Sequence, residues 1–228
     1  MPQVPPPKRH PYDQWSPDAR ALDLVGDKWT LLIVRDLASG PRRFVELQRV
    51  LPGISTEQLR SRLNRMVADG MLTRKRYREV PPRVDYELTD RARDLMPVLA
   101  ALARWGYDWT WGEPRSSESI DIGAIFRLAP GLLEAAEPER TLEFVVPDAG
   151  YVYALTISGS GVELTEGRAE NPDARVRGTA AAWVAALSPG MNRDGLEISG
   201  NSDLVTAVLD MLGPAPLERA TTHGYAAA

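Results

Sequence analysis

Residues 52–70, PGISTEQLRSRLNRMVADG, decide how the first half of this chain folds. Gly53 permits a tight turn, and Ser55 followed three residues later by Gln58 has the spacing of a capping box, so a helix is predicted to begin here. Gly70 is placed to end that helix. One face of the helix is apolar and carries Leu59, Leu63, Met66 and Val67. The segment therefore predicts an amphipathic helix that the chain enters through a short turn.

The opposite face of this helix carries the residue types that read DNA. Arginine pairs with guanine edges and asparagine with adenine, while serine and threonine contact bases or phosphates. The alternative is an ordinary amphipathic helix with a solvated, charged face. If the helix reads DNA, the residues predicted to contact it are Ser55, Thr56, Glu57, Arg60, Ser61, Asn64 and Arg65.

A β-hairpin is predicted directly after the helix, with extended segments at Met71–Tyr77 and Arg83–Leu88. Between positions 42 and 83, 11 basic residues stand against 4 acidic ones, a local charge of +7 that favours contact with a polyanion. An arginine-rich solvated surface would give the same count. As a wing beside the recognition helix, this region adds further predicted DNA contacts at Arg43, Arg74, Arg76, Arg78 and Arg83.

Helices are predicted on both sides of this region. Two short ones are separated by Gly26, a third begins at Phe44, and a long one is capped by Thr89, runs to about Trp111 and is kinked at Pro97. The long helix has too large an apolar stripe for a small isolated domain. We expect it to pair with a second copy, helped by the helix from Pro17 to Val25. The predicted dimerisation residues are Leu22, Leu95, Leu102, Trp105 and Trp109.

Residues 16–111 resemble the HxlR-type branch of the MarR-like bacterial regulators. The resemblance rests on Gly26-Asp27-Lys28-Trp29, on Gly53-Ile54-Ser55, and most specifically on residues 81–89, PPRVDYELT, followed by Trp105. It implies a winged helix-turn-helix homodimer that reads a pseudo-palindromic operator in double-stranded DNA. Many members of this family have Cys-Pro before the first helix, where this chain has Ser16-Pro17. A serine hydroxyl cannot perform thiol redox chemistry.

The second half of the chain has a different character. Residues 1–112 carry a net charge of +5, whereas residues 113–228 carry −9. Residues 113–119, EPRSSES, are predicted to be a linker. After them we expect a helix near Ile120–Ala135, three or four strands, and two further helices. The fold class is therefore α+β, with an antiparallel sheet in the C-terminal domain at 120–213.

The C-terminal domain resembles the sterol-carrier-protein fold. The likeness lies in residues 171–179, NPDARVRGT, in Ala182-Trp183 and in residues 195–201, GLEISGN. It implies an apolar tunnel between sheet and helices, suited to a small apolar or aromatic effector. Each candidate lining residue could equally be a plain core residue. These candidates are Phe126, Leu128, Tyr151, Tyr153, Trp183, Leu187, Met191, Leu209, Met211 and Leu212.

The composition argues against an enzyme. The chain contains no cysteine, and its two histidines, His10 and His223, lie in the expected tails at 1–14 and 214–228, so neither a catalytic triad nor a metal site is predicted. We expect no cofactor. No apolar run approaches the roughly 20 residues of a membrane span, and the start has no signal-peptide core. A cytoplasmic bacterial protein without a membrane partner is therefore expected.

Together these patterns predict a homodimeric repressor with a DNA-binding domain at 15–112. An apolar effector bound in the C-terminal domain would relieve repression. Two alternatives remain open. In one, the C-terminal domain only supports oligomerisation; in the other, the chain is a lipid carrier.

Overall fold

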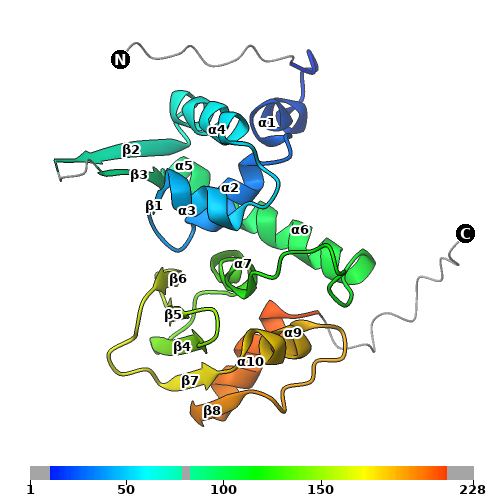
Figure 1. Ribbon diagram of the computed structural model, residues 1–228, viewed down its shortest axis with the longest axis vertical. Helices are drawn as coiled ribbons and strands as arrows, with labels where there is room; N and C mark the ends of the chain where they lie inside the picture. The colour runs from blue at the N-terminus through cyan, green and yellow to red at the C-terminus, as the bar shows by residue number, and fades with distance from the viewer. Residues whose placement is uncertain (1–10, 79–82, 215–228) are drawn as a thin grey trace, which may run out of the picture. The chain divides into compact units, whose positions relative to one another are not determined.

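The computed structural model describes residues 11–78 and 83–214, and its contacts divide the chain between Met96 and Pro97 into two compact units (Figure 1). This division falls ahead of the linker expected at 113–119, because the helix that follows Met96 makes its hydrogen bonds within the C-terminal unit. Of the expected tails, residues 1–10 and 215–228 lie outside the described residues.

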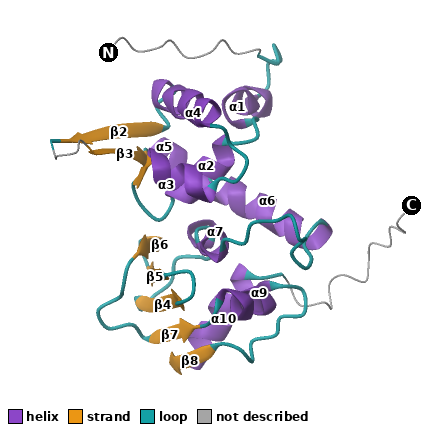
Figure 2. Ribbon diagram, viewed as in Figure 1, coloured by secondary structure: helices purple, strands orange, loops and turns teal. Residues whose placement is uncertain are grey.

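The N-terminal unit is a winged helix-turn-helix (Figure 2). Its small antiparallel sheet has the strand order β1-β3-β2, and β2 and β3 form the predicted hairpin. The elements are α1 (Pro17–Val25), α2 (Thr30–Leu37), β1 (Arg42–Arg43), α3 (Phe44–Val50), α4 (Thr56–Ala68), β2 (Leu72–Tyr77), β3 (Arg83–Leu88) and α5 (Asp90–Arg93).

The loop between α1 and α2 is built around Gly26 and Asp27. A Cβ atom at Gly26 would lie 2.6 Å from the carbonyl oxygen of Leu22, so only glycine fits without a shift of the backbone. The Asp27 carboxylate accepts the N–H groups of Trp29 (2.8 Å) and Thr30 (3.1 Å), which satisfies donors at the start of α2. These contacts fix the direction in which α2 leaves α1.

The C-terminal unit combines short helices with a five-stranded sheet. Its elements are α6 (Met96–Trp109), α7 (Ile122–Phe126), α8 (Ala129–Leu132), β4 (Arg140–Val146), β5 (Tyr151–Ser158), β6 (Gly161–Glu166), β7 (Ala174–Arg177), α9 (Ala180–Leu187), β8 (Glu197–Gly200) and α10 (Ser202–Leu212). The Thr179 hydroxyl accepts the Ala182 N–H at 3.2 Å and caps α9, as predicted.

Two segments that the sequence predicted as one helix each are divided into two, and a proline lies beside each break. The helix expected from Thr89 is split into α5 and α6, and Pro97 lies in the first turn of α6. The single helix expected near Ile120–Ala135 is split into α7 and α8, with Pro130 at the start of α8. Proline lacks an N–H and clashes with a preceding turn, so it is accommodated at the start of a new helix. The first helix is thus divided just before the kink predicted at Pro97, and the prediction of one helix near Ile120–Ala135 was wrong.

The large sheet has the order β6-β5-β4-β7-β8 and is mixed rather than antiparallel. The predicted antiparallel arrangement is wrong for one pair of strands, because β4 and β7 run parallel, with Leu142 opposite Ala174. Residues 167–173 carry the chain from β6 past β5 and β4 to β7. The buried Glu143 carboxylate of β4 accepts the Ala169 N–H of this crossing segment at 3.0 Å. Turn signals predict hairpins, but they do not reveal such a crossing.

The core of the C-terminal unit lies between the sheet and α7–α10. Alternate residues of β4 point into it, and the ring of Phe126 stacks on Phe144 with centroids 4.7 Å apart. Trp183 packs edge-on to both rings, with centroids 4.8 and 5.7 Å from theirs.

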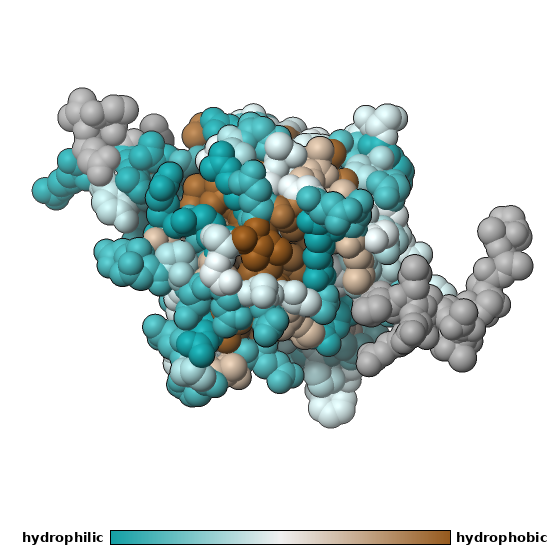
Figure 3. Space-filling view, turned by 90° about the horizontal axis from the view of Figure 1, so that it is seen from below, coloured by the Kyte–Doolittle hydropathy of each residue, from teal (hydrophilic) through white to brown (hydrophobic). Residues whose placement is uncertain are grey.

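Figure 3 shows a face that is largely hydrophilic around a small apolar area. In the part of the chain that the structure describes, no helix has the length and apolar character needed to cross a membrane.

Candidate DNA-binding surface

The helix-turn-helix consists of α3, the turn at 51–55 and α4. Gly53 adopts a φ of +83°, in the left-handed region that favours glycine. The predicted capping box is confirmed: the Ser55 hydroxyl accepts the Gln58 N–H, and the Gln58 amide oxygen accepts the Ser55 N–H, both at 3.1 Å. Gln48 of α3 donates to the Thr56 hydroxyl at 2.9 Å and ties the two helices together.

The two faces of α4 divide as the sequence predicted. Leu59, Leu63 and Met66 are buried, and Val67 is half-buried. Among the predicted DNA-contacting residues, Ser55, Thr56, Glu57 and Arg60 are exposed, while Ser61, Asn64 and Arg65 are half-buried. Arg60 forms an ion pair with Glu57 one turn earlier. The helix therefore presents a polar face with a partly neutralised first turn.

Two contacts that the sequence pattern did not predict hold α4 in place. Arg62, which lies between the outward-facing positions, pairs with Asp27 at 2.9 Å and connects α4 to the start of α2. Arg91 of α5 donates to the carbonyl oxygen of Asp69 at 2.9 Å, just beyond the end of α4. The Gly26-Asp27 motif signals a capped helix start, but its ion pair with α4 depends on tertiary packing.

Thr89 is the N-cap residue of α5, as predicted, but its side chain closes the base of the wing. Its hydroxyl makes no capping hydrogen bond to α5 and donates instead to the carbonyl oxygens of Gly70 (2.8 Å) and Met71 (3.1 Å). The predicted N-cap position is thus correct, but the Thr89 side chain makes no capping hydrogen bond. These bonds join the C-terminal end of the recognition helix to the end of β3 and fix where the hairpin begins.

The wing also contacts the recognition helix through Arg74. The Arg74 guanidinium donates to the amide oxygen of Asn64 and lies over the ring of Tyr86, 5.3 Å from its centroid. Because the guanidinium can only donate, Asn64 must direct its oxygen toward the wing. Its amide N–H groups remain on the other side. Arg74 thus lies between the helix and the hairpin rather than at the tip of the wing.

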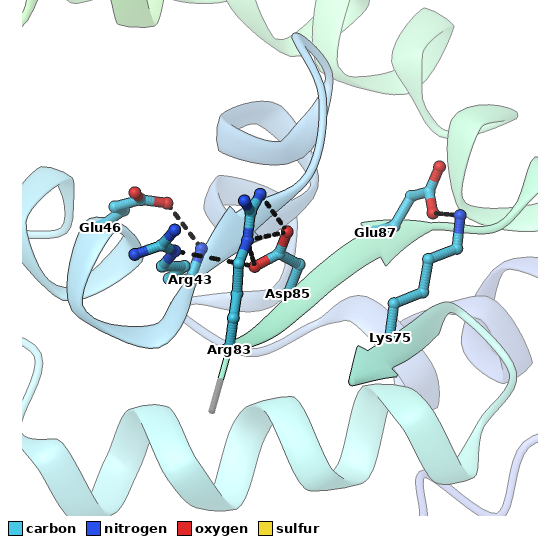
Figure 4. Close-up of polar contacts among 6 residues, drawn as sticks. All are labelled: Arg43, Glu46, Lys75, Arg83, Asp85 and Glu87. Carbon is cyan, nitrogen blue, oxygen red and sulfur yellow. Dashed lines mark hydrogen bonds and ion pairs between the residues drawn. The ribbon is translucent and has the colours of Figure 1, made fainter. Parts of the chain in front are cut away.

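A buried carboxylate organises the edge of the wing (Figure 4). Asp85 accepts hydrogen bonds from Arg83 at 2.6 and 2.9 Å, and Arg43 of β1 approaches it to 3.9 Å. The hydrogen bond from Arg83 is the main cause that holds the pKa of Asp85 below its ordinary value of 3.8, against the opposing effect of burial. Arg83 also lies over the Tyr77 ring, at 5.1 Å. Arg43 and Arg83 are therefore partly engaged within the protein.

The remaining cations of this surface differ in whether they have an acidic partner. Lys75 is paired with Glu87, and this hydrogen bond raises the pKa of Lys75 (Figure 4). Arg76 and Arg78 are exposed near the end of β2 and have no ion-pair partner within residues 11–78 and 83–214, nor does the half-buried Arg65 on α4. These three arginines are not neutralised by an acidic partner there, and Arg74, which contacts Asn64 and the Tyr86 ring, adds to the positive charge of the surface.

The predicted dimerisation residues are largely exposed. On α6, the side chains of Leu102, Trp105 and Trp109 are 53, 56 and 50 % exposed, and Leu22 on α1 is 47 % exposed. Leu95 is half-buried between α5 and α6. Such large apolar side chains, left open to solvent at this spacing, are typical of an interaction surface.

Most of the predicted effector-lining residues lie in or against the packed core of the C-terminal unit, and only Met191 and Met211 lie outside it. Inside the core, the ring of Phe126 contacts the rings of both Tyr153 and Trp183. Leu187, Leu209 and Leu212 are also buried core residues, while Leu128 and Tyr151 are half-buried at its edge. Met191 is half-buried, and Met211 is 40 % exposed on α10. The aromatic residues among the candidates lie together because their rings pack against each other in the core.

Comparison with known proteins finds a family match and similar proteins for the first half of the chain. The model of the HxlR-like helix-turn-helix family matches residues 24–114. The HTH-type transcriptional regulator sll1512 of Synechocystis sp. is 43 % identical over 93 residues, which cover 41 % of this chain and 69 % of that protein. The regulator BH0655 of Halalkalibacterium halodurans is 44 % identical over 94 residues, covering 41 % and 83 %.

Among solved structures, the redox regulator HypR in its reduced form is 36 % identical, with a TM-score of 0.39. The match covers 40 % of this chain and 90 % of that one. The relatives are transcriptional regulators, not enzymes. Residues 115–228 lie outside the family match.

Proposed function

Because this chain belongs to the HxlR-like helix-turn-helix family of DNA-binding transcriptional regulators, we propose that it binds a pseudo-palindromic operator as a homodimeric repressor. In this proposal α4 lies in the major groove and the β2–β3 hairpin contacts the flanking backbone. The residues proposed to contact bases are Arg60, Ser61 and Asn64, and those proposed to contact phosphates are Arg65, Arg76 and Arg78.

The observation that carries this proposal is the distribution of charge over α4 and the wing. Arg65, Arg76 and Arg78 have no acidic partner within the described residues, so phosphate binding would not require an internal ion pair to break. Arg43 and Arg83, by contrast, contact the buried Asp85. We therefore assign these two mainly to the shape of the wing, although both were predicted to contact DNA.

Operator selection from random duplex DNA tests this proposal. The selected sequences should contain two inverted half-sites separated by about one helical turn, 10–10.5 base pairs centre to centre. Binding should weaken steeply as salt rises, because phosphate contacts release counterions. Selection of unrelated sequences, or of single half-sites bound by a monomer, would contradict the proposal.

We further propose that the acidic C-terminal domain regulates DNA binding by taking up a small apolar or aromatic effector. The likeness to the sterol-carrier fold and the charge of −9 over residues 113–228 support this role, since an acidic domain gains nothing from lying on DNA. The contacts among Phe126, Tyr153 and Trp183 favour a second candidate, in which this domain only supports oligomerisation.

Trp183→Ala separates the two candidates. The Trp183 side chain is completely buried, and its indole N–H donates to the Val145 carbonyl at 3.2 Å. If it is a core residue, the substitution should lower the free energy of unfolding by about 3–5 kcal/mol. If it lines a site already open to solvent, the decrease should be below about 1 kcal/mol, and the affinity for a fluorescent fatty acid should change. Denaturant unfolding and a fluorescence titration measure the two effects.

A further inference from the structure

Three side chains from α6 and the residues just after it reach the ends of three other helices in the same unit. Arg104 donates to the carbonyl oxygen of Leu132 at 3.2 Å, and the Trp111 indole donates to that of Leu187 at 2.9 Å. The Tyr107 hydroxyl donates to the carbonyl oxygen of Leu212. These three leucines are the last residues of α8, α9 and α10 respectively.

The chemistry of these contacts suits the ends of helices. The last carbonyl groups of a helix have no partner within it and lie at the negative end of its dipole, so a donor from outside is favourable there. Tyr107 and Trp111 also contact each other edge-to-face, with ring centroids 5.5 Å apart. Burial raises the pKa of Tyr107 to about 12, so its hydroxyl keeps its proton.

The opposite stripe of α6 is apolar and open to solvent. Val98, Leu102, Trp105 and Trp109 follow one another at spacings of four, three and four residues, which places them on one side of the helix. Each is about half exposed, from 49 to 56 %. The donors at 104, 107 and 111 follow a similar spacing, displaced around the helix. One helix thus carries a surface for a second copy and a set of contacts to the C-terminal unit.

We propose that Arg104, Tyr107 and Trp111 are positioning residues that let the C-terminal domain set the orientation of the dimerisation helix. This inference rests on the dimer proposed above. A change at the C-terminal ends of α9 or α10 would alter the hydrogen bonds to α6 and thereby the dimer contact. Only Asp94 and Leu95 separate α6 from the last helix of the DNA-binding unit. A signal from the C-terminal domain therefore has a short covalent route to the DNA-binding unit.

The double variant Tyr107→Phe/Trp111→Phe tests this inference in the full chain. It removes both donors, keeps aromatic rings at both positions and leaves the exposed stripe untouched. We expect the dimer dissociation constant, measured by analytical ultracentrifugation, to rise about tenfold, from two neutral hydrogen bonds of roughly 0.5–1.5 kcal/mol each. A dissociation constant equal to that of the parent would overturn the proposal.

Thr179→Ala is the matched control. It removes the cap at the other end of α9, where Thr179 accepts the Ala182 N–H, and should destabilise the C-terminal domain by a similar amount. We expect this variant to dimerise as the parent does. If it weakens the dimer as much as the double variant, the dimer needs only a folded domain and the proposal fails. A monomeric parent would instead overturn the proposed dimer, and this inference with it.

Discussion

At the scale of single residues, Asp85 needs its arginine partners, because burying a carboxylate costs free energy unless the charge is paired. It lies on β3, where Arg83 of the same strand donates a hydrogen bond to it and Arg43 of β1 approaches it. In the sequence of this strand, Val84, Tyr86 and Leu88 alternate with Asp85 and Glu87, a pattern that predicts an outward-facing Asp85. It is instead 1 % exposed, and Arg43, its pairing partner on β1, lies beside its carboxylate.

Asp85→Asn should therefore destabilise the protein in a pH-dependent way. The folded state holds the pKa of Asp85 below 3.8, so the stabilisation is present above about pH 4 and disappears as the pH falls through the lowered pKa. At pH 7 we expect a decrease of at least about 1 kcal/mol in the free energy of unfolding. Urea unfolding at pH 7 and pH 3 should show the difference from the parent shrink at the lower pH. If the variant and the parent differ in unfolding free energy by the same amount at both pH values, Arg83 does not stabilise the charged form of Asp85.

At the scale of elements, two of the arginines on α4 lie two positions apart and have different roles: one is assigned to DNA and the other to contacts of the helix within the protein. Arg60 is exposed and outward, whereas Arg62 pairs with Asp27. Arg60→Ala should relax base preference at one position per half-site, and removing each base interaction should cost about 1–3 kcal/mol of binding free energy. Arg62→Ala should instead lower thermal stability and weaken binding to all sequences alike. Competition binding with operator and scrambled DNA separates them, and identical profiles for the two variants would contradict the assignment.

The β2–β3 hairpin also carries two neighbouring cations with different expected roles. Arg76 has no acidic partner among the described residues, while Lys75 beside it is held by Glu87. Arg76→Ala should reduce the slope of log affinity against log salt by about one unit, without changing sequence preference. Lys75→Ala should change the slope less, because the variant also removes a competing ion pair. Fluorescence anisotropy over a range of salt concentrations measures both slopes, and equal slopes would argue against phosphate contact by Arg76.

Elements with strong local signals could be predicted from the sequence, and those set by distant contacts could not. The capping box of Ser55 and Gln58 and the apolar stripe of α4 identified that helix, since both depend on neighbours within the helix itself. The hydroxyl of Thr89 turned to the wing because two carbonyl groups lay within reach. The partners of Arg62 and Arg74, and the parallel pairing of β7, depend on residues far away in the chain.

At the scale of the whole molecule, the boundary between the two units matters for any truncation. The family match runs to residue 114, but Arg104 and Tyr107 of α6 and Trp111 just after it donate hydrogen bonds to the ends of α8, α10 and α9. Cutting the chain after the family match therefore removes the partners of α6 and leaves both of its sides uncovered.

A chain ending at residue 113 should consequently self-associate beyond a dimer and become less soluble, because apolar area is exposed on two sides of α6. A matched chain ending at residue 96 lacks α6 and should stay soluble and monomeric. Sedimentation velocity of both proteins at the same concentration checks this. A stable dimer from the chain ending at 113, as soluble as the full chain, would show that α6 does not need the C-terminal unit.

The parallel pairing of β4 with β7 determines the order in which the C-terminal sheet can assemble on the ribosome. β4, β5 and β6 follow one another and can pair as successive hairpins, whereas Ala174, the partner of Leu142, is synthesised only after all three strands. Pairings that are distant in sequence must first overcome the entropy of closing the loop. Until β7 arrives, one side of β4 is an open edge facing neighbouring nascent chains. Glu143 places a charge in the middle of that strand, which disfavours pairing with another chain during synthesis.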